Sequence, residues 1–351
     1  MRRRTIRSAP VAPARRSRLA AAAAILPLAV SMIPAGPQPA PRTGTTTTLT
    51  TAARRAAQAQ EFSVPLGNLR DWAGRVVATL DGVHIDGHSR VHTLDKDCEM
   101  HFGAHTPAFR GDPDGLVLEP MNACVEPFPG KPVQNDDDWT RFADQITGTD
   151  VIASGVPRIW PEHLTGGGGP SNPNHAVELH PLTSLAADGQ TVDFSPDIFA
   201  GEFRGGVHEP TALDILRNTS VSVRRNGGSI DISFLFNSTG HIGNFTVLDI
   251  IVERTSITED GAGSFRMNGE VFVDDTTAVP VRLLTVKGSA VNDQVQRIRA
   301  GHRSLVTMAQ TLVLFSLSPE SLAAASDRSH GQPVNVDRPI QLILYGAAES
   351  E

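Results

Sequence analysis

Three short polar clusters between residues 97 and 181 hold the side chains that could do chemistry in this chain. The clusters are Asp97–His101 (DCEMH), Glu119–Cys124 (EPMNAC) and His175–Pro181 (HAVELHP). Carboxylates and imidazoles recur in them, and both groups bind divalent metal ions. A bound metal ion can also activate water for hydrolysis. The residue types therefore point to a ligand-binding or metal-binding surface, or to a hydrolytic centre.

The spacing within the clusters predicts which side chains share a face. Side chains alternate along a β-strand, so Glu178 and His180 are expected on one face and His175 on the other. An earlier strand is expected to present three polar side chains to one face: Asp97, Glu99 and His101. If the two polar faces meet, they are expected to bind a divalent ion. The predicted ligands are His101, Glu178 and His180, with either His163 or His105 as a loop ligand.

The same residues also have a structural interpretation, which we favour at this stage. Buried carboxylates and imidazoles need hydrogen-bond partners, so they would connect strands and loops. The sequence contains no nucleophile elbow and no His-Glu-x-x-His helix. The four glycines at 166–169 precede Pro170 rather than Lys, which predicts a flexible loop and not a phosphate-binding loop. No residue is therefore assigned a catalytic role.

Cys98 and Cys124 are the only two cysteines of the chain. Two lone cysteines in an oxidising compartment usually form a structural disulfide. This one would close a loop of about 26 residues, which stabilises a fold by about 3.5 kcal/mol in the chain-entropy model. A zinc site is disfavoured because neither cysteine has a second thiol at zinc-type spacing.

The N-terminus predicts an extracytoplasmic location. An arginine-rich start is followed by an apolar stretch over residues 19–33 and then by small residues, which is the pattern of a secretory signal peptide. The stretch contains Pro27 and is short for a membrane span of about 20 residues. Residues 1–35 are thus interpreted as a signal peptide, with an uncleaved N-terminal anchor as the alternative. The protein is expected to be secreted or held in the cell envelope, with membrane contact only through this segment.

Residues 36–61 are rich in Pro, Thr and Ala, and are predicted to form a disordered tether. The chain has 31 basic and 38 acidic residues, but seven of the arginines lie in the first 35 residues. Without that segment 24 basic residues face 38 acidic ones, a net charge of −14. Such a protein is not expected to bind nucleic acid, because phosphate neutralisation needs clustered Lys and Arg. Scarce lysine with abundant Ala, Arg and Gly indicates a GC-rich bacterial genome.

Residues 62–188 are predicted to form a first domain of five strands and one helix. A helix is expected from Asp136 to Ile146, because three acids precede an apolar stripe. The expected strands are Trp72–Ile85, Arg90–Leu94, Cys98–Gly103, Asp150–Ile159 and Ala176–Leu185, and Gly115–Glu119 is expected to be another short strand or an extension. Their order around the helix is that of an OB-like five-stranded barrel.

The span 69–183 resembles a group of uncharacterised secreted bacterial proteins with an OB-like domain. The resemblance rests on a D-x-D/E-x-H strand, an E-x-x-N-A-C segment and a last strand that ends E-L-H-P. In this chain these are Asp97–His101, Glu119–Cys124 and Glu178–Pro181. The resemblance implies an OB-like fold and export, and it implies no activity.

Residues 189–351 are predicted to form a second β-rich domain, either a sandwich or a barrel. Two alternating runs around Asn226-Gly227 predict a β-hairpin over residues 220–234. Further strands are expected at 245–256, 263–272, 279–286, 310–317 and 339–345. No family resemblance is found here.

The sequence favours an exported, non-enzymatic binding or interaction protein whose ligand is unknown. OB-like barrels bind ligands on the face of strands two and three, which here includes Arg90, His92 and His101. A cell-surface polymer or a protein is the expected partner. The alternative is a metal-dependent hydrolase that acts on an extracytoplasmic polymer through the histidine and carboxylate clusters. No cofactor is expected apart from a divalent metal.

Overall fold

The computed structural model describes residues 59–201, 209–236, 245–274 and 276–347. The signal peptide or anchor predicted at 1–35 and residues 36–58 of the tether predicted at 36–61 lie outside the described residues. The tether prediction is wrong for residues 59–61, which begin a strand that pairs with residues 233–235. Within the described part of the chain, no helix is both long and apolar enough to cross a membrane.

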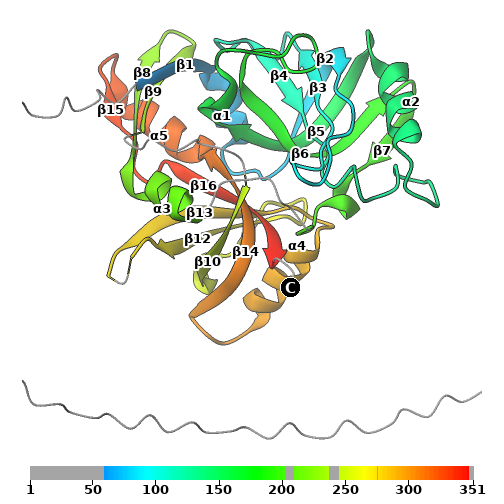
Figure 1. Ribbon diagram of the computed structural model, residues 1–351. Coiled ribbons are helices and arrows are strands. Elements are labelled where there is room, and N and C mark those ends of the chain that lie inside the picture. The colour runs from blue at the N-terminus through cyan, green and yellow to red at the C-terminus, as the bar shows by residue number, and fades with distance from the viewer. Residues whose placement is uncertain (1–58, 202–208, 237–244, 275, 348–351) are drawn as a thin grey trace, which may run out of the picture. The chain divides into compact units, whose positions relative to one another are not determined.

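The first half of the described chain forms a closed five-stranded barrel (Figure 1). Its strands are β2 (Ala78–His88), β3 (Phe102–His105), β4 (Gly115–Leu118), β5 (Asp150–Ile159) and β6 (His175–Ala187). They are ordered β4-β3-β2-β5-β6, and a parallel pairing of β4 with β6 closes the ring. Helix α2 (Asp136–Ile146) connects β4 to β5, and β7 (Gln190–Asp193) extends the sheet beside β6. This observed topology is consistent with the predicted OB-like barrel.

The second half contains another closed five-stranded barrel with the same arrangement. Its strands are β10 (Phe245–Glu253), β12 (Phe265–Phe272), β13 (Ala278–Thr285), β14 (Leu305–Leu317) and β16 (Ile340–Ala347). In both barrels the ring runs through the first, second, third, fifth and fourth strand, and the third and fifth are parallel. Helix α4 (Ala290–Ala300) again connects the third strand to the fourth, and β11 (Thr258–Glu259) lies beside β12. Of the two predicted alternatives, the structure has a barrel.

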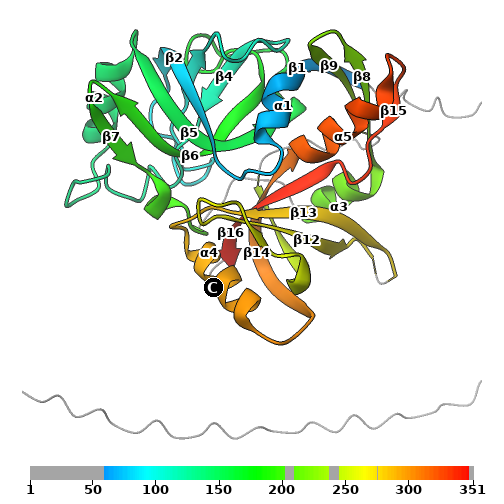
Figure 2. The ribbon, with the colours of Figure 1, turned by 180° about the vertical axis from the view of Figure 1, so that it is seen from behind.

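A separate four-stranded sheet joins distant parts of the chain (Figures 1 and 2). Its order is β1 (Ala59–Pro65), β9 (Ser229–Phe236), β8 (Thr219–Asn226) and β15 (Val334–Asn335). The predicted hairpin is β8–β9. Helices α1 (Leu66–Trp72), α3 (Glu209–Asn218) and α5 (Pro319–Ser329) complete the fold, with three short 3-10 turns at 161–163, 195–197 and 254–256. The division into domains at residue 188 stays a prediction.

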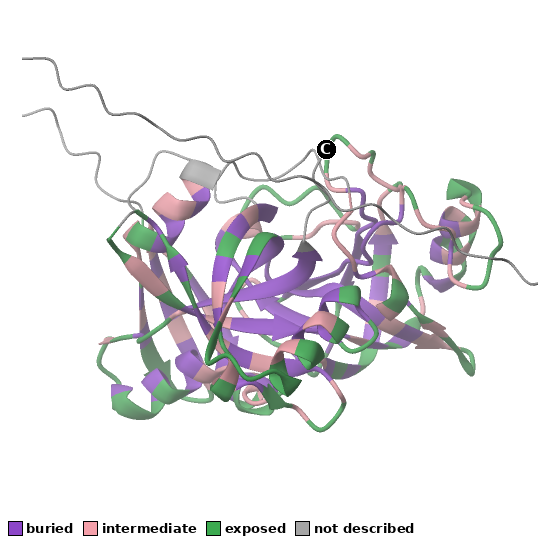
Figure 3. Cartoon of the chain, turned by 90° about the horizontal axis from the view of Figure 1, so that it is seen from below, coloured by how far each residue is buried: buried purple, intermediate pink, exposed green. Residues whose placement is uncertain are grey.

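Helix α2 shows why a predicted element forms where it does. The side chain of Asn135 accepts a hydrogen bond from the Asp137 amide and caps the helix, and three acidic residues occupy the first turn. Trp139, Ala143 and Ile146 are buried at helical spacing. In general the strands carry the buried residues, while exposed residues gather in turns and on the outer faces of helices (Figure 3).

Three predicted strand segments are wrong in whole or in part. The segment Trp72–Ile85 was expected to be one long strand, but it contains the end of α1 and the start of β2. The apolar residues at 66, 69 and 72 have helical spacing and are buried. The strands expected at Arg90–Leu94 and Cys98–Gly103 are instead an irregular connection that lasts until Phe102. Cys98 has a φ of 57°, a left-handed conformation outside the range of a regular strand.

The connection between β5 and β6, residues 160–174, packs across the first barrel. It covers the face of β2, β3 and β4 that points away from the barrel core. On each of these strands it contacts a glycine. A Cβ at Gly103 would lie 2.0 Å from the Pro170 carbonyl oxygen, and one at Gly115 would lie 2.2 Å from that of Asn174. A Cβ at Gly87 would approach Pro170 to 3.2 Å. The strand glycines therefore permit a backbone contact that side chains would block.

Candidate functional site

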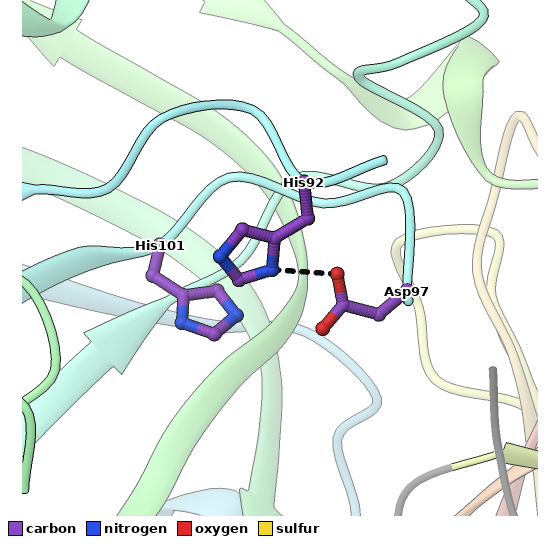
Figure 4. A group of neighbouring side chains, drawn as sticks. All are labelled: His92, Asp97 and His101. Carbon is purple, nitrogen blue, oxygen red and sulfur yellow. Dashed lines mark hydrogen bonds and ion pairs between the residues drawn. The ribbon is translucent and has the colours of Figure 1, made fainter. Parts of the chain in front are cut away.

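The connection between β2 and β3 carries three polar side chains that converge: His92, Asp97 and His101 (Figure 4). We call them the triad. The Nδ1 atom of His92 lies 2.6 Å from Asp97 Oδ1, and the rings of His92 and His101 meet edge to face at 4.4 Å. One ligand atom of each residue lies within 4.8 Å of the other two. The side chains of His92 and Asp97 are 21% and 23% exposed, so solvent reaches the triad.

The disulfide fixes this irregular connection. Cys98 and Cys124 are bonded, with their Cα atoms 5.0 Å apart, and Cys98 is fully buried. Ser89 and His101 form two further bonds, from Ser89 N to the His101 carbonyl and from His101 N to Ser89 Oγ. The predicted disulfide thus ties the triad to the segment that contains Glu119.

The protonation states of Asp97 and His101 suit ligand binding. Burial opposes ionisation of Asp97, but its hydrogen bond with His92 and the attraction of both histidines outweigh this, so the pKa of Asp97 is below its ordinary value. Burial lowers the pKa of His101, and this outweighs the attraction of Glu119. An ionised carboxylate and a neutral imidazole are the forms that bind metal ions.

A fully enclosed set of charged residues lies directly behind the triad. We call it the buried network; its members are Glu99, Glu119, Arg158, His175, Glu178 and His180. His101 Nε2 lies 3.3 Å from Glu119 Oε1 and so connects the triad to it. His180 contacts Glu119 through Nδ1 and Glu99 through Nε2, the latter at 2.8 Å. The network therefore unites the three clusters of the sequence.

Glu178 forms the other end of the buried network. Arg158 Nη1 lies 2.5 Å from Glu178 Oε2, and His175 Nε2 lies 3.0 Å from Glu178 Oε1. The other nitrogen of His175 lies 2.7 Å from the carbonyl oxygen of Pro173. His163 stands beside His175, with 5.1 Å between ring centroids. His175 thus contacts oxygen atoms through both nitrogens, as a protonated imidazole does.

The side chains of the buried network compensate one another. Burial opposes protonation of His180, but Glu99 and Glu119 outweigh it and hold the pKa of His180 well above its ordinary value. Burial likewise opposes ionisation of Glu178, but Arg158 and the neighbouring histidines hold its pKa well below the usual range. The pKa of Glu99 is raised well above normal, chiefly by its complete burial. The ion pairs agree with a structural interpretation, but both carboxylate oxygens of Glu99, Glu119 Oε2 and His180 Nε2 make no hydrogen bond within the described residues.

The structure brings together most of the predicted metal ligands. His101, Glu178 and His180 belong to one connected set, and the groups Glu99–His101–Glu119 and Glu119–Glu178–His180 each have ligand atoms within 4.8 Å. However, both nitrogens of His180 already contact carboxylates, and Glu178 is held by Arg158. The triad differs from these two enclosed groups because it is open to solvent.

Other predictions about site residues need correction. The expected common face of Asp97, Glu99 and His101 does not exist, because these residues are not in a strand; Glu99 is fully buried and Asp97 is half-buried. His175 was expected to face away from Glu178, but the two are in contact. Of the two loop histidines, His163 adjoins the network.

His105 and Arg90 lie outside the buried network. His105 is exposed and pairs with Asp86, with 2.9 Å between Nδ1 and Oδ2. Arg90 is exposed on the connection that carries the triad. Arg158 is not among the predicted site residues, although an arginine within the apolar run 156–160 is a signal of a buried ion pair. The sequence does not identify the partner of Arg158, because the pairing of β5 with β6 brings Glu178 to it.

Comparison with known proteins gives no match to a family, to a curated protein or to a solved structure.

Proposed function

We propose that this is an exported, non-enzymatic binding protein whose first barrel holds one divalent transition-metal ion at the triad. The observation that carries the proposal is the convergence of His92, Asp97 and His101 at a solvent-accessible point. Two imidazoles with one carboxylate suit Zn²⁺ and related ions, whereas Ca²⁺ and Mg²⁺ prefer oxygen ligands.

An unsatisfied atom supports this assignment. His101 Nε2 is buried and makes no hydrogen bond within the described residues, although Glu119 Oε1 lies 3.3 Å away. Burying such a nitrogen without a partner is unfavourable. A metal ion between the triad side chains would satisfy it, and Glu119 would act as a fourth ligand or as a neighbouring acceptor.

Burial favours a binding role over a hydrolytic one. A hydrolase needs an acid or base that reaches the substrate. Behind the triad, Glu99 and Glu119 are 0% and 2% exposed, so a polymer does not reach them. The test of the proposal must therefore distinguish a metal-binding protein from a metal-dependent hydrolase.

We also propose an extracytoplasmic location, in the cell envelope or outside the cell. The Cys98–Cys124 disulfide supports it because disulfides persist in oxidising compartments. The signal-like N-terminus and the likeness of residues 69–183 to secreted bacterial proteins support it as well.

The test is calorimetric titration of the full-length, metal-stripped protein with Zn²⁺, together with elemental mass spectrometry after dialysis. We expect one ion per chain, and an affinity weaker by about 100-fold in His92→Ala and in Asp97→Ala. His105→Ala is the matched control, because it removes an exposed histidine that also pairs with an aspartate.

Equal binding in all four proteins, or no binding, would overturn the proposal. Zinc-dependent cleavage of a cell-wall polymer, lost in Asp97→Ala, would overturn the non-enzymatic role and establish the hydrolase.

A further inference from the structure

A small hollow lies on the second barrel, against β12 and β13. Its volume is about 20 Å³, and its lining includes Arg75, Arg266, Arg282, Glu320 and Gln341. Arg266 and Arg282 come from neighbouring strands, and Glu320 from the first turn of α5. Arg75 comes from the connection between α1 and β2. Nothing in the triad or the buried network contributes to this hollow.

Two of these arginines share a single carboxylate. Arg282 Nη2 lies 3.0 Å from Glu320 Oε1, and Arg266 Nη1 lies 3.4 Å from Glu320 Oε2. The Nε atoms of both arginines are buried and have no hydrogen-bond partner within the described residues. Each side chain is still 28% exposed. The buried Nε atoms are closed to a ligand, so a second acid would meet the exposed parts of the two guanidinium groups, which carry more donors than Glu320 satisfies.

Arg75 adds a third guanidinium at the rim of the hollow. It is exposed and forms no ion pair with any residue that the structure describes. Gly74 precedes it with a φ of 88°, and a Cβ there would lie 4.0 Å from the guanidinium of Arg266. The backbone turn thus brings the two arginine-bearing segments together.

The hollow is a positive spot on an acidic protein. Three arginines face one glutamate, whereas the whole chain has a net charge of −7. The nearby carboxylate of Asp260 accepts hydrogen bonds from the backbone amides of Val76, Ala262 and Ser264. These three backbone amides therefore already stabilise the negative charge of Asp260.

We propose that this hollow binds a carboxylate group of an acidic polysaccharide. Planar guanidinium groups match carboxylates, and Glu320 shows that Arg266 and Arg282 are oriented to receive one. A volume of about 20 Å³ holds roughly one water-sized group, such as one carboxylate oxygen, so the rest of the sugar chain would lie across the open surface.

The strand arrangement favours a sugar polymer over an acidic peptide. A peptide that adds to a sheet needs a free strand edge. Here β12 is paired with β13, β10 and β11, and β13 is paired with β12 and β16. The two strands that line the hollow, β12 and β13, therefore offer no free edge to which a peptide could add.

The test is calorimetric titration of the full-length protein with trigalacturonate at low salt. We expect Arg75→Ala to weaken binding about tenfold, as loss of one charge-assisted hydrogen bond does. Glu320→Gln should strengthen binding several-fold, because it removes the competing carboxylate; a purely structural ion pair predicts no gain. Arg70→Ala, an exposed arginine of α1 that pairs with Asp327, is the control for general charge effects.

Unchanged affinity in Arg75→Ala, or an equal loss in Arg70→Ala, would overturn the proposal. So would equal binding of tetraglutamate, which would assign the hollow to acidic peptides. Free galacturonate that binds as tightly as the trimer would limit the ligand to a single acidic sugar and would overturn the polymer part of the proposal.

Discussion

At the scale of single residues, His175 shows how the buried network balances its charge. Its two nitrogens lie near the Pro173 carbonyl and the Glu178 carboxylate, and only 1% of the residue is exposed. Burial opposes its protonation, but the hydrogen bond and attraction of Glu178 outweigh it, so the pKa of His175 is raised. A raised pKa means that folding favours the protonated form.

We therefore expect His175→Gln to destabilise the fold most at low pH. The contribution of a group with a raised pKa is complete below its unfolded pKa, about 6.5 for histidine, and is lost as pH rises through the folded pKa. The variant should lose about 2 kcal/mol of unfolding free energy near pH 6, as a hydrogen bond to a charged group contributes. The loss should shrink as pH rises. Urea unfolding of both proteins from pH 5.5 to 9 measures it.

His105→Gln is the control for this comparison, because His105 is exposed and pairs only at the surface. Its unfolding free energy should stay close to that of the wild type at every pH. A His175→Gln difference that grows with pH would contradict a protonated His175.

At the scale of elements, the covering connection 160–174 depends on strand glycines. We expect Gly103→Ala to destabilise the fold by about 2 kcal/mol, as overpacking does, because the new Cβ would meet the Pro170 carbonyl at 2.0 Å. Cleavage by a protease within 160–174 should also become faster. Urea unfolding and limited proteolysis measure the two effects.

Gly67→Ala is the matched glycine substitution for that experiment. Gly67 lies in α1, is exposed and has no atom within 4 Å of an added Cβ. It should gain a few tenths of a kcal/mol to about 1 kcal/mol from helix propensity. Gly103→Ala with wild-type stability and proteolysis would show that the connection does not pack on β3.

The same scale shows what the sequence could and could not predict. Regular periodicity gave α2, β5, β6 and the β8–β9 hairpin, because their burial follows their own pattern. The connection 89–101 was misassigned because its shape depends on a disulfide and on a left-handed Cys98. The meeting of the three polar clusters was predictable from their composition. Their connection to Arg158 was not, because it depends on strand pairing between β5 and β6.

At the scale of the whole molecule, the end of β5 connects the buried network to the second barrel. Arg158 Nε donates to the Phe315 carbonyl at 2.9 Å, and Ile159 N donates to Ser316 Oγ at 3.1 Å. Trp160 stacks on the ring of Phe315, with 5.7 Å between centroids. Since Arg158 also binds Glu178, this one side chain forms bonds to both barrels. The two barrels are therefore expected to unfold together.

Replacing this arginine should weaken both barrels at once. Arg158→Met removes one partner of a buried ion pair, and such a loss costs about 3–5 kcal/mol because Glu178 would remain buried and uncompensated. Amide hydrogen exchange should then become faster in β6 and β14 to a similar extent. Arg141→Met, which breaks an exposed pair with Asp138, should cost less than about 1 kcal/mol. Faster exchange confined to β6 would mean that each barrel keeps its own stability, and that Arg158 acts within the first barrel alone.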